Sequence, residues 1–555
     1  MSQPFFSYYL AVWQKMLNFV AKKRTAGKMM TNERRYPIGV QTFEKVIRGG
    51  YVYVDKTDLM WKMTKVSNYV FLSRPRRFGK SLLSSTLHSF FAGQKELFAG
   101  LKVMELEQEW MEYPVIHLDI SIAKGKESAD ELRRTLMLML SRDKFFDGND
   151  LEKTPGERLT GMIHRAYEKT GLQVAVIIDE YDAPLLEVLH EEQNLPAFRK
   201  VMQEFYVPLK TCDPYIKFCF ITGITKFSQL SIFSTINNLK NLSLRPDFSA
   251  ICGITEEEVK TVFAEDIRSM AQKYECSPEE MFLKIKNRYD GYHFAKESPD
   301  IYNPFSLLNA FDDGELTSSW FASATPSYLI QQMKHFRTDI TSLENIEEPA
   351  DAFDIPMEAM TTALPLLYQS GYLTIKSYDR ETEMYKLSIP NQEVRIGYTK
   401  GLLPTFTGME IGYTQKGFAL KFWRALKKND LELALQEMKT FLAAVPYVEG
   451  FKKKLEEAAT AEGFYEYTLW LIFNMLNVYA RTQVKCSGGR TDMVVWMPDA
   501  IYVLELKVNG TAKEALNQIN TKGYAIPYAT DGRRVVKAGI RFNIDSRTID
   551  EWIIE

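Results

Sequence analysis

The chain has 555 residues, of which 45% are hydrophobic and 25% charged, close to ordinary globular usage. This composition excludes a disordered or collagen-like chain, and the length predicts about three or four domains. Sixty-nine basic and seventy-one acidic residues leave a formal net charge of −2, so nucleic-acid binding would need a local basic surface. Five cysteines without a CxxC pair, and only six histidines, disfavour a zinc site and fit a reducing cytoplasm.

The N-terminal segment 4–20 is fairly apolar and is followed by a basic cluster at 22–24. A secretory signal has the reverse order, and the run is too short to span a bilayer. We therefore expect a soluble, cytoplasmic protein without membrane contact. Residues 1–35 are interpreted as an N-terminal extension, with Met29 and Met30 as alternative starts.

Residues 36–260 alternate short β-branched or aromatic runs with helical patterns, which predicts an α/β domain. Four of the runs are continuously apolar, as in strands of a parallel sheet that is buried on both faces. These predicted strands lie at 69–72, 115–118, 174–178 and 216–222.

The middle of the chain predicts two further units. Residues 261–345 favour a helical domain, whose first helix follows a Thr255 cap and an acidic first turn. An acidic loop at 347–351 is expected at the next boundary. Residues 346–414 then predict a helix, a β-hairpin and a linker, which together are typical of a winged-helix-like module. Such a module is either a DNA reader or a lid or spacer, because a fold does not fix a function.

The predicted strand at 69–72 leads through 73–81 into a helical pattern, which is the context of a P-loop. The glycine of this segment would admit a phosphate, its lysine would reach the β and γ oxygens, and its serine would hold Mg²⁺. An arginine replaces the usual first glycine, so three arginines would bring positive charge to the nucleotide. A Gly-Lys-Ser that merely starts a helix is the alternative. The candidate nucleotide-binding residues are Arg74, Arg76, Arg77, Phe78, Gly79, Lys80 and Ser81.

The strand at 174–178 ends in Asp179 and Glu180, at the carboxyl edge where open α/β sheets bind ligands. This pattern predicts a Walker B strand, in which Asp179 holds the magnesium-bound water and Glu180 activates the attacking water. A solvated loop is the alternative. Thr222, at the end of another strand, would sense the γ-phosphate or belong to a plain turn. Asp119 is interpreted as structural.

The segments that carry a family resemblance lie at 36–40, 53–57, 73–81, 179–182, 222–228 and 233–239. They resemble the predicted AAA-ATPase-like family of bacterial proteins, whose pattern shares the arginine at position 74. The similarity extends from residue 36 to about residue 530. It implies an α/β multidomain protein with a P-loop (AAA-like) parallel-sheet ATPase core that uses ATP and Mg²⁺. It also implies a helical and winged-helix-like middle and a C-terminal PD-(D/E)XK nuclease-like domain.

The last part of the chain, 415–555, predicts a helical lead-in and another α/β unit. Glu505 and Lys507 lie two apart on a predicted strand and so share a face, and a hairpin brings Asp492 beside them. Two carboxylates can hold Mg²⁺, while a lysine can orient or activate water against a phosphodiester. This is the arrangement of a PD-(D/E)XK site. A solvated strand face is the alternative.

Three more residues are candidates for the same site. Glu462 and Glu466 lie four apart on one face of an upstream helix, so either could add a carboxylate. The resemblance implies that Gln518, on the following helix, supplies a glutamine near the site. The family more often has a histidine where Glu466 stands.

We therefore expect an ATP-binding and ATP-hydrolysing protein whose nucleotide state controls a Mg²⁺-dependent nuclease-like domain acting on nucleic acid. Whether the substrate is DNA or RNA, and whether several copies assemble into a homo-oligomer, is left open. The alternative is a nucleotide-switched regulatory or interaction protein whose nuclease-like domain binds a partner without cutting. The complete set of Asp492, Glu505 and Lys507 favours the first hypothesis.

Overall fold

The computed structural model describes residues 34–555 apart from several short segments, so the predicted N-terminal extension lies almost wholly outside it. Within the described part of the chain, no helix is long and apolar enough to cross a membrane. The segments left out are 149–150, 189–190, 192, 227–238, 321–328, 330–331, 334, 337, 339–342, 344–345, 357–359, 399–412, 444–460 and 476–478.

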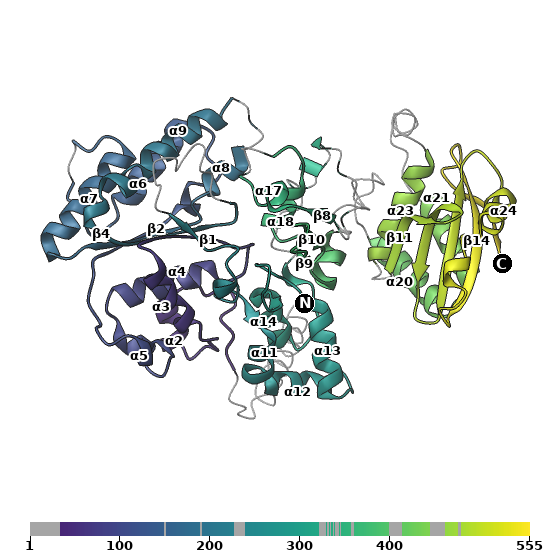
Figure 1. The fold of residues 1–555 in the computed structure, drawn as a ribbon, viewed down its shortest axis with the longest axis horizontal. Helices are drawn as coiled ribbons and strands as arrows, with labels where there is room; N and C mark the ends of the chain where they lie inside the picture. The colour runs from purple at the N-terminus through teal and green to yellow at the C-terminus, as the bar shows by residue number, and fades with distance from the viewer. Residues whose placement is uncertain are drawn as a thin grey trace, which may run out of the picture.

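The N-terminal unit is built on a five-stranded parallel sheet in the order β2-β3-β4-β1-β5 (Figure 1). Its apolar strands are buried on both faces because helices cover each side, and the four predicted strands are confirmed. The strands are β1 (Tyr69–Ser73), β2 (Val115–Asp119), β3 (Val174–Asp179), β4 (Ile216–Gly223) and β5 (Lys240–Asn241).

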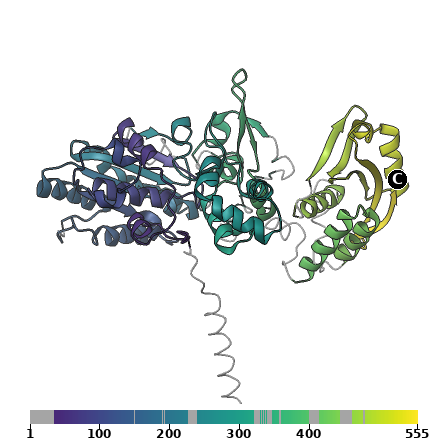
Figure 2. The same ribbon diagram turned by 90° about the horizontal axis from the view of Figure 1, so that it is seen from below.

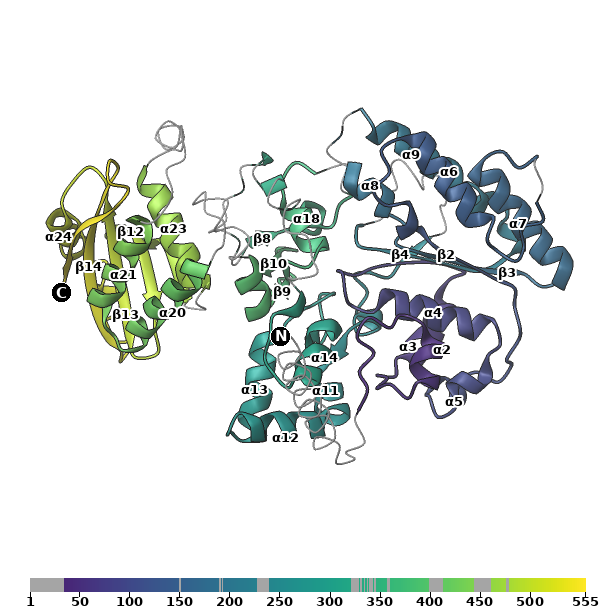
Figure 3. The same cartoon turned by 180° about the vertical axis from the view of Figure 1, so that it is seen from behind.

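Two layers of helices enclose this sheet, as Figures 1 and 3 show from opposite sides. One layer consists of α2 (Phe43–Arg48), α3 (Thr57–Val66), α4 (Lys80–Phe91) and α5 (Val103–Leu106). The other contains α6 (Ala129–Leu140), α7 (Pro155–Thr170), α8 (Ala183–Val188), α9 (Leu195–Tyr206) and α10 (Pro208–Thr211). Alternate residues of each strand therefore enter two separate cores.

The helical unit follows as predicted. Thr255 begins it with a reciprocal cap, because its hydroxyl accepts from Glu258 N–H while the Glu258 carboxylate accepts from Thr255 N–H at 2.8 Å. The helices are α11 (Glu256–Val262), α12 (Ala264–Lys273), α13 (Pro278–Tyr289) and α14 (Pro304–Asp313), with a short pair of strands, β6 (Ile254–Thr255) and β7 (Ile301–Tyr302).

A three-stranded antiparallel sheet in the order β8-β10-β9 forms the next unit, and the predicted hairpin is confirmed. The predicted acidic loop at 347–351 is wrong, because its first part belongs to strand β8. Glu347 lies opposite Lys386 in the sheet, and such a pair of opposite charges stabilises neighbouring strands. The elements are β8 (Ile346–Glu348), α17 (Ala350–Phe353), α18 (Leu364–Gln369), β9 (Thr374–Tyr378) and β10 (Tyr385–Ser388).

The turn after α13 joins the helical unit to this small sheet. The Lys376 ammonium donates to Gly291 O at 2.7 Å, and the Thr374 hydroxyl accepts from His293 N–H at 2.8 Å. Gly291 has a φ of 99°, and a Cβ there would lie 2.4 Å from Pro390 O. The turn therefore requires glycine both for its conformation and for its close approach to the neighbouring chain.

The C-terminal unit lies to one side of the others (Figure 2) and has a mixed five-stranded sheet in sequence order. Only the pairing of β13 with β14 is parallel. Residues of the earlier helices pack with one face of the sheet and residues of α24 with the other. The elements are α20 (Tyr413–Lys427), α21 (Leu431–Ala443), α23 (Ala461–Met475), β11 (Tyr479–Cys486), β12 (Gly489–Trp496), β13 (Ala500–Lys507), α24 (Ala512–Lys522), β14 (Arg534–Asn543) and β15 (Thr548–Ile554).

Gly253 provides a test of how the N-terminal and helical units fit together. Its φ is 93°, and an added Cβ would lie 2.2 Å from Ile301 and 3.3 Å from Phe78. We expect Gly253→Ala to lower the free energy of unfolding by about 2–4 kcal/mol through backbone strain and overpacking. Gly100→Ala is the control, because its φ is 81° but nothing lies within 4 Å of the new methyl group. Denaturant unfolding of both variants measures the difference, and equal losses would contradict the close packing.

Candidate active sites

The loop between β1 and α4 has the form of a phosphate-binding loop. Gly79, with a φ of 91°, caps the helix, and Lys80 is the first helical residue. Among the described residues, no hydrogen bond occupies the backbone N–H groups from Arg76 to Gly79. Amides at a helix N-terminus form a natural site for an anion.

Lys80 is buried at the base of this loop. Its ammonium donates to Arg74 O at 2.9 Å and to Pro75 O at 3.2 Å. Burial lowers the pKa of Lys80, and the carboxylates of Asp179 and Glu180 act in the opposite direction. The lysine therefore lies within electrostatic reach of both predicted Walker B residues.

The two acidic residues follow β3 at the carboxyl edge of the sheet. Asp179 is 4% exposed and accepts from Glu180 N–H at 2.9 Å, while a hydrogen bond from Ser81 favours its charged form. Burial raises the pKa of both Asp179 and Glu180. Glu180 has a φ of 49°, a left-handed conformation that is uncommon for a side-chain-bearing residue and that recurs at functional sites. The structure thus brings Lys80, Ser81, Asp179 and Glu180 together.

Asp119 lies near this group and has the structural role predicted for it, because its carboxylate caps a short 3₁₀ helix by accepting from Ser121 N–H at 2.9 Å. Asp119 lies directly beside Asp179 in the pairing of β2 with β3, and it raises the pKa of both Asp179 and Glu180.

The three arginines of the loop do not form one cluster around the phosphate position. Arg74 is 2% exposed, and its guanidinium donates to the carbonyls of Ser73, Ser243 and Phe248, each at 2.9 Å. The Arg77 guanidinium lies 4.6 Å from the centre of the Phe305 ring. The expectation that Arg74 brings charge to the nucleotide is corrected, because backbone carbonyls occupy its guanidinium. For Arg76 and Arg77 that role stays a prediction.

The side chains of two further predicted nucleotide-binding residues make structural contacts. The Thr222 hydroxyl is fully buried and donates to Leu72 O at 2.6 Å, so it ties β4 to β1 rather than facing a γ-phosphate. Phe78 packs edge-on against Tyr292 at 4.9 Å and Phe294 at 5.2 Å between ring centres. Phe78 therefore anchors the loop to the helical unit.

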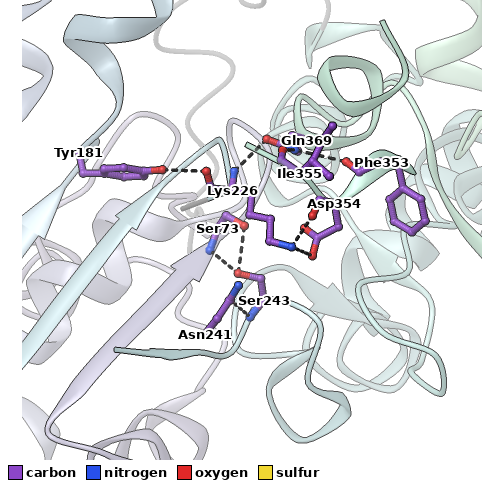
Figure 4. A network of polar contacts seen from close by, with 9 residues as sticks. All are labelled: Ser73, Tyr181, Lys226, Asn241, Ser243, Phe353, Asp354, Ile355 and Gln369. Atoms are coloured by element: carbon purple, nitrogen blue, oxygen red, sulfur yellow. Dashed lines mark hydrogen bonds and ion pairs between the residues drawn. The ribbon is translucent and has the colours of Figure 1, made fainter. Parts of the chain in front are cut away.

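A polar network connects the turn that follows β3, here called the Walker B turn (residues 180–182), to the three-stranded unit (Figure 4). The Tyr181 hydroxyl donates to Lys226 O at 3.2 Å, and Lys226 N–H donates to Gln369 Oε1 at 2.8 Å. The Lys226 ammonium also pairs with the Asp354 carboxylate at 2.7 Å. Asp182 braces the same turn by accepting from Thr225 N–H at 2.7 Å.

A second network holds the end of β1. The Ser243 hydroxyl accepts from Ser73 N–H at 2.9 Å and bonds the Ser73 hydroxyl at 3.0 Å (Figure 4). In the first network, Gln369 also donates from Nε2 to Ile355 O at 2.6 Å. The P-loop and the Walker B turn are thus both fixed to segments outside the central sheet.

The C-terminal candidate site centres on the Glu505 carboxylate, which is 1% exposed. It accepts from Asp492 N–H at 3.3 Å, from the Lys507 ammonium at 3.4 Å, and from Gln518 Nε2. The Asp492 carboxylate accepts from Leu506 N–H at 2.8 Å. The register of β12 with β13 and the middle of α24 therefore bring the four predicted residues together.

Two carboxyl groups of this site have strongly raised pKa values. Burial raises the pKa of Glu505 to about 7, and the neighbouring Asp492 charge adds to the effect. Burial likewise raises the pKa of Glu466, on α23, to about 7. Perturbed carboxyl groups that gather in this way are typical of functional sites.

Glu466 is bound by a residue that the sequence did not indicate. Gln483, on β11, donates from Nε2 to the Glu466 carboxylate and has a left-handed φ of 52°. The Asp492 charge also acts on Glu466. The side chain of Glu462 lies outside the described residues, so its predicted role stays a prediction.

The donor set fits Mg²⁺ in its chemistry. Asp492 and Glu505 provide hard carboxylate oxygens, and water commonly fills the remaining positions around Mg²⁺. The described residues contain no group of three or more His, Cys, Asp or Glu side chains arranged to hold a metal ion. A metal would therefore depend on these two carboxylates and on solvent.

Comparisons with known proteins agree with one candidate site in the N-terminal unit and another in the C-terminal unit. Residues 37–233 match the family described as "Predicted AAA-ATPase", and residues 460–552 match the "PD-(D/E)XK nuclease superfamily". An "Uncharacterized protein in vnfD 5'region" of Azotobacter chroococcum mcd 1 is 31% identical over 533 residues, covering 94% of this chain and 99% of its own.

A Walker-type ATPase of Pyrococcus abyssi is a weaker structural match. It is 12% identical, the match covers 61% of this chain and 93% of that one, and the TM-score of 0.30 is too low to carry an argument. The near full-length relative and the two matched regions agree with the motifs described above. The chain belongs to the predicted AAA-ATPase family and ends in a domain of the PD-(D/E)XK nuclease superfamily.

Proposed function

We propose that the N-terminal unit binds Mg²⁺-ATP and hydrolyses it. The observation that carries this proposal is the convergence of Lys80 and Ser81 with Asp179 and Glu180 at one edge of the parallel sheet. Lys80 would exchange its loop carbonyls for phosphate oxygens, and Ser81 and Asp179 would hold the magnesium shell. Glu180 would orient and deprotonate the attacking water.

The C-terminal unit is proposed to cleave phosphodiesters of nucleic acid. Asp492 and Glu505 would hold Mg²⁺, which as a bound ion supplies Lewis-acid stabilisation of the phosphate charge. Lys507 and Gln518 both contact Glu505, so they keep its carboxylate in one orientation. This complete set of contacts supports cleavage over the alternative of a binding module that does not cut.

We also propose that the middle of the chain transmits the nucleotide state. The domain boundaries remain predictions from the sequence: an ATPase domain at 36–260, a helical domain at 261–345, a winged-helix-like module and linker at 346–414, and a helical lead-in with the nuclease-like domain at 415–555. Strand β6 and helix α11 place the start of the helical unit a few residues earlier, at Ile254. The contacts of Lys226 with Asp354 and Gln369 support a coupling role for the winged-helix-like module rather than an independent DNA-reading role.

The ATPase proposal is tested with Lys80→Ala and Glu180→Gln. We expect Lys80→Ala to weaken ATP binding at least about tenfold, because charged hydrogen bonds to phosphate are lost. Glu180→Gln should bind ATP normally and hydrolyse it about a hundredfold more slowly, since only the general base is removed. Labelled-ATP binding and phosphate release measure the two effects. Lys95→Ala, which removes an exposed lysine, is the control, and unchanged binding by Lys80→Ala would contradict the assignment.

The nuclease proposal is tested with Asp492→Asn and Glu505→Gln. Both variants should lose at least about a hundredfold in Mg²⁺-dependent cleavage of labelled DNA or RNA while keeping ATP hydrolysis, because metal charge is lost without a change of shape. Titration calorimetry with Mn²⁺ provides a second measurement. The control is Asp499→Asn, which changes an exposed carboxylate in the turn between β12 and β13. Full cleavage by either site variant would assign the activity elsewhere.

The coupling proposal is tested with Asp354→Asn. This change keeps the side-chain shape and removes the negative charge that pairs with Lys226. We expect ATP hydrolysis within about twofold of wild type and a loss of the effect of ATP on nucleic-acid cleavage. The exposed Asp351→Asn on the same short helix is the matched control. If Asp354→Asn cleaves with the same ATP dependence as wild type, this contact does not transmit the signal.

A further inference from the structure

The two first strands of the C-terminal sheet carry exposed basic residues next to the candidate metal site. Arg481 and Lys485 lie on β11, and Arg490 lies on β12. Lys485 and Arg490 are directly opposite each other across the two strands. Like charges in that relation destabilise a sheet, so their placement calls for a compensating anion.

No described acidic side chain neutralises this pair through an ion pair. Lys485 and Arg490 form none with any residue that the structure describes. Arg490 does lie near enough to Glu466 to lower its pKa, which places the basic pair close to the acidic site. A polyanion would satisfy the basic residues while one of its phosphates reaches the carboxylates.

The strand geometry aligns these residues with Asp492. Alternate residues of a strand share a face, so Arg490, Asp492, Val494 and Trp496 lie on one side of β12, with Val494 fully buried between Asp492 and Trp496. The residues of β11 opposite that face include Arg481 and Lys485. At about 3.3 Å per residue, the row from Arg490 to Trp496 extends about 20 Å.

Aromatic side chains stand at the other end of the row. The rings of Trp496 and Tyr528 meet edge-on with centres 5.9 Å apart, and both residues are partly exposed. Arg481 is close enough to Tyr528 to act on its phenol electrostatically. Ile526, next to this pair, is 74% exposed. Basic and aromatic side chains in one row are the combination that binds a strand with unpaired bases.

The end of helix α24 comes close to the β11–β12 turn, since a Cβ at Gly488 would lie 1.7 Å from Lys522 O, but Arg481, Lys485 and Arg490 stay exposed. The helix packs mainly on β13, β14 and β15. It still reaches the metal site, since Gln518 contacts Glu505.

We propose that this basic face, formed by Arg481, Lys485, Arg490, Trp496 and Tyr528, binds a single strand of nucleic acid and leads its backbone to Asp492. The proposal rests on the proposed nuclease function and specifies its substrate as single-stranded. Phosphates contact the three basic residues, and bases stack on the two aromatic rings. A duplex keeps its bases stacked inside, so it cannot use the aromatic part of the face.

The test is a binding experiment with the full-length protein in EDTA, where metal-dependent cleavage is absent. The probe is a fluorescein-labelled oligothymidylate of about 20 nucleotides, compared with a duplex of the same length by fluorescence anisotropy. We expect the single strand to bind more tightly than the duplex. Lys485→Ala/Arg490→Ala should weaken binding at least about tenfold and reduce the salt dependence by about two phosphate contacts. Tyr528→Ala should weaken binding with an unchanged salt dependence.

The control variant is Lys513→Ala, an exposed lysine on α24 outside the face, and we expect it to bind like wild type. If wild type binds the strand and the double variant binds equally well, the basic face is overturned while the nuclease proposal stands. Preferred binding of the duplex overturns the single-strand assignment, and equally tight binding of polyglutamate overturns recognition of nucleic acid by this face. A wild type that binds neither nucleic acid overturns the face and the proposed substrate together.

Discussion

Removal of charged groups from water is the constraint on which both candidate sites depend. Lys80, Asp179 and Glu505 are all nearly inaccessible to solvent, and an isolated charge in such a place would be costly. Each is tolerated because polar groups at a strand end converge on it: loop carbonyls on Lys80, Ser81 on Asp179, and Lys507 with Gln518 on Glu505. The same arrangement that offsets the cost also concentrates electrostatic force where a phosphate or a metal ion would bind. Stability and chemistry are therefore set by the same contacts.

The middle units also contribute to the first site, because the proposed phosphate-binding loop and the turn beside it are held by contacts with them. Phe78 is held by an aromatic pair of the helical unit, and the Walker B turn is bonded through Lys226 to the three-stranded unit. A packed contact of this kind has few intermediate positions, so under the proposed coupling a displacement of the loop would be passed on as a change of packing. Gly291 and Gly371 allow neighbouring segments of these units to lie in close contact. A methyl group at either position would collide with the adjacent residue.

Much of this architecture could be predicted from the sequence, because continuous apolar runs, helix caps and a hairpin report local structure directly. The four strands around the P-loop, the Thr255 cap and the pairing that joins Asp492 to Glu505 all follow from such patterns. The predictions that the structure corrects concern contacts between segments that are distant in the sequence. Nothing near Arg74 in the sequence shows that its guanidinium meets Ser243 and Phe248, and Thr222 bonds a strand 150 residues away. The strand at 346–348 was missed for the same reason, since its pairing partner follows it by some forty residues. Gln483 had no local signal, because its role depends on a helix that precedes it and on an unusual backbone angle.

The buried guanidinium of Arg74 has a consequence for how such loops diverge. In most P-loops a small residue at this position lets the chain bend tightly, and the loop is shaped by its own backbone. Here a long side chain crosses from the loop to the carbonyls of two other segments, and the loop is braced from outside, with the Phe294 ring 4.4 Å from the guanidinium. Glycine and arginine are therefore not exchangeable variants of one design. Glycine at position 74 would leave three carbonyls without their hydrogen-bond donor and open a cavity the size of a side chain. An evolutionary path between the two loop types therefore has to change the segments around residues 243 and 248 at the same time.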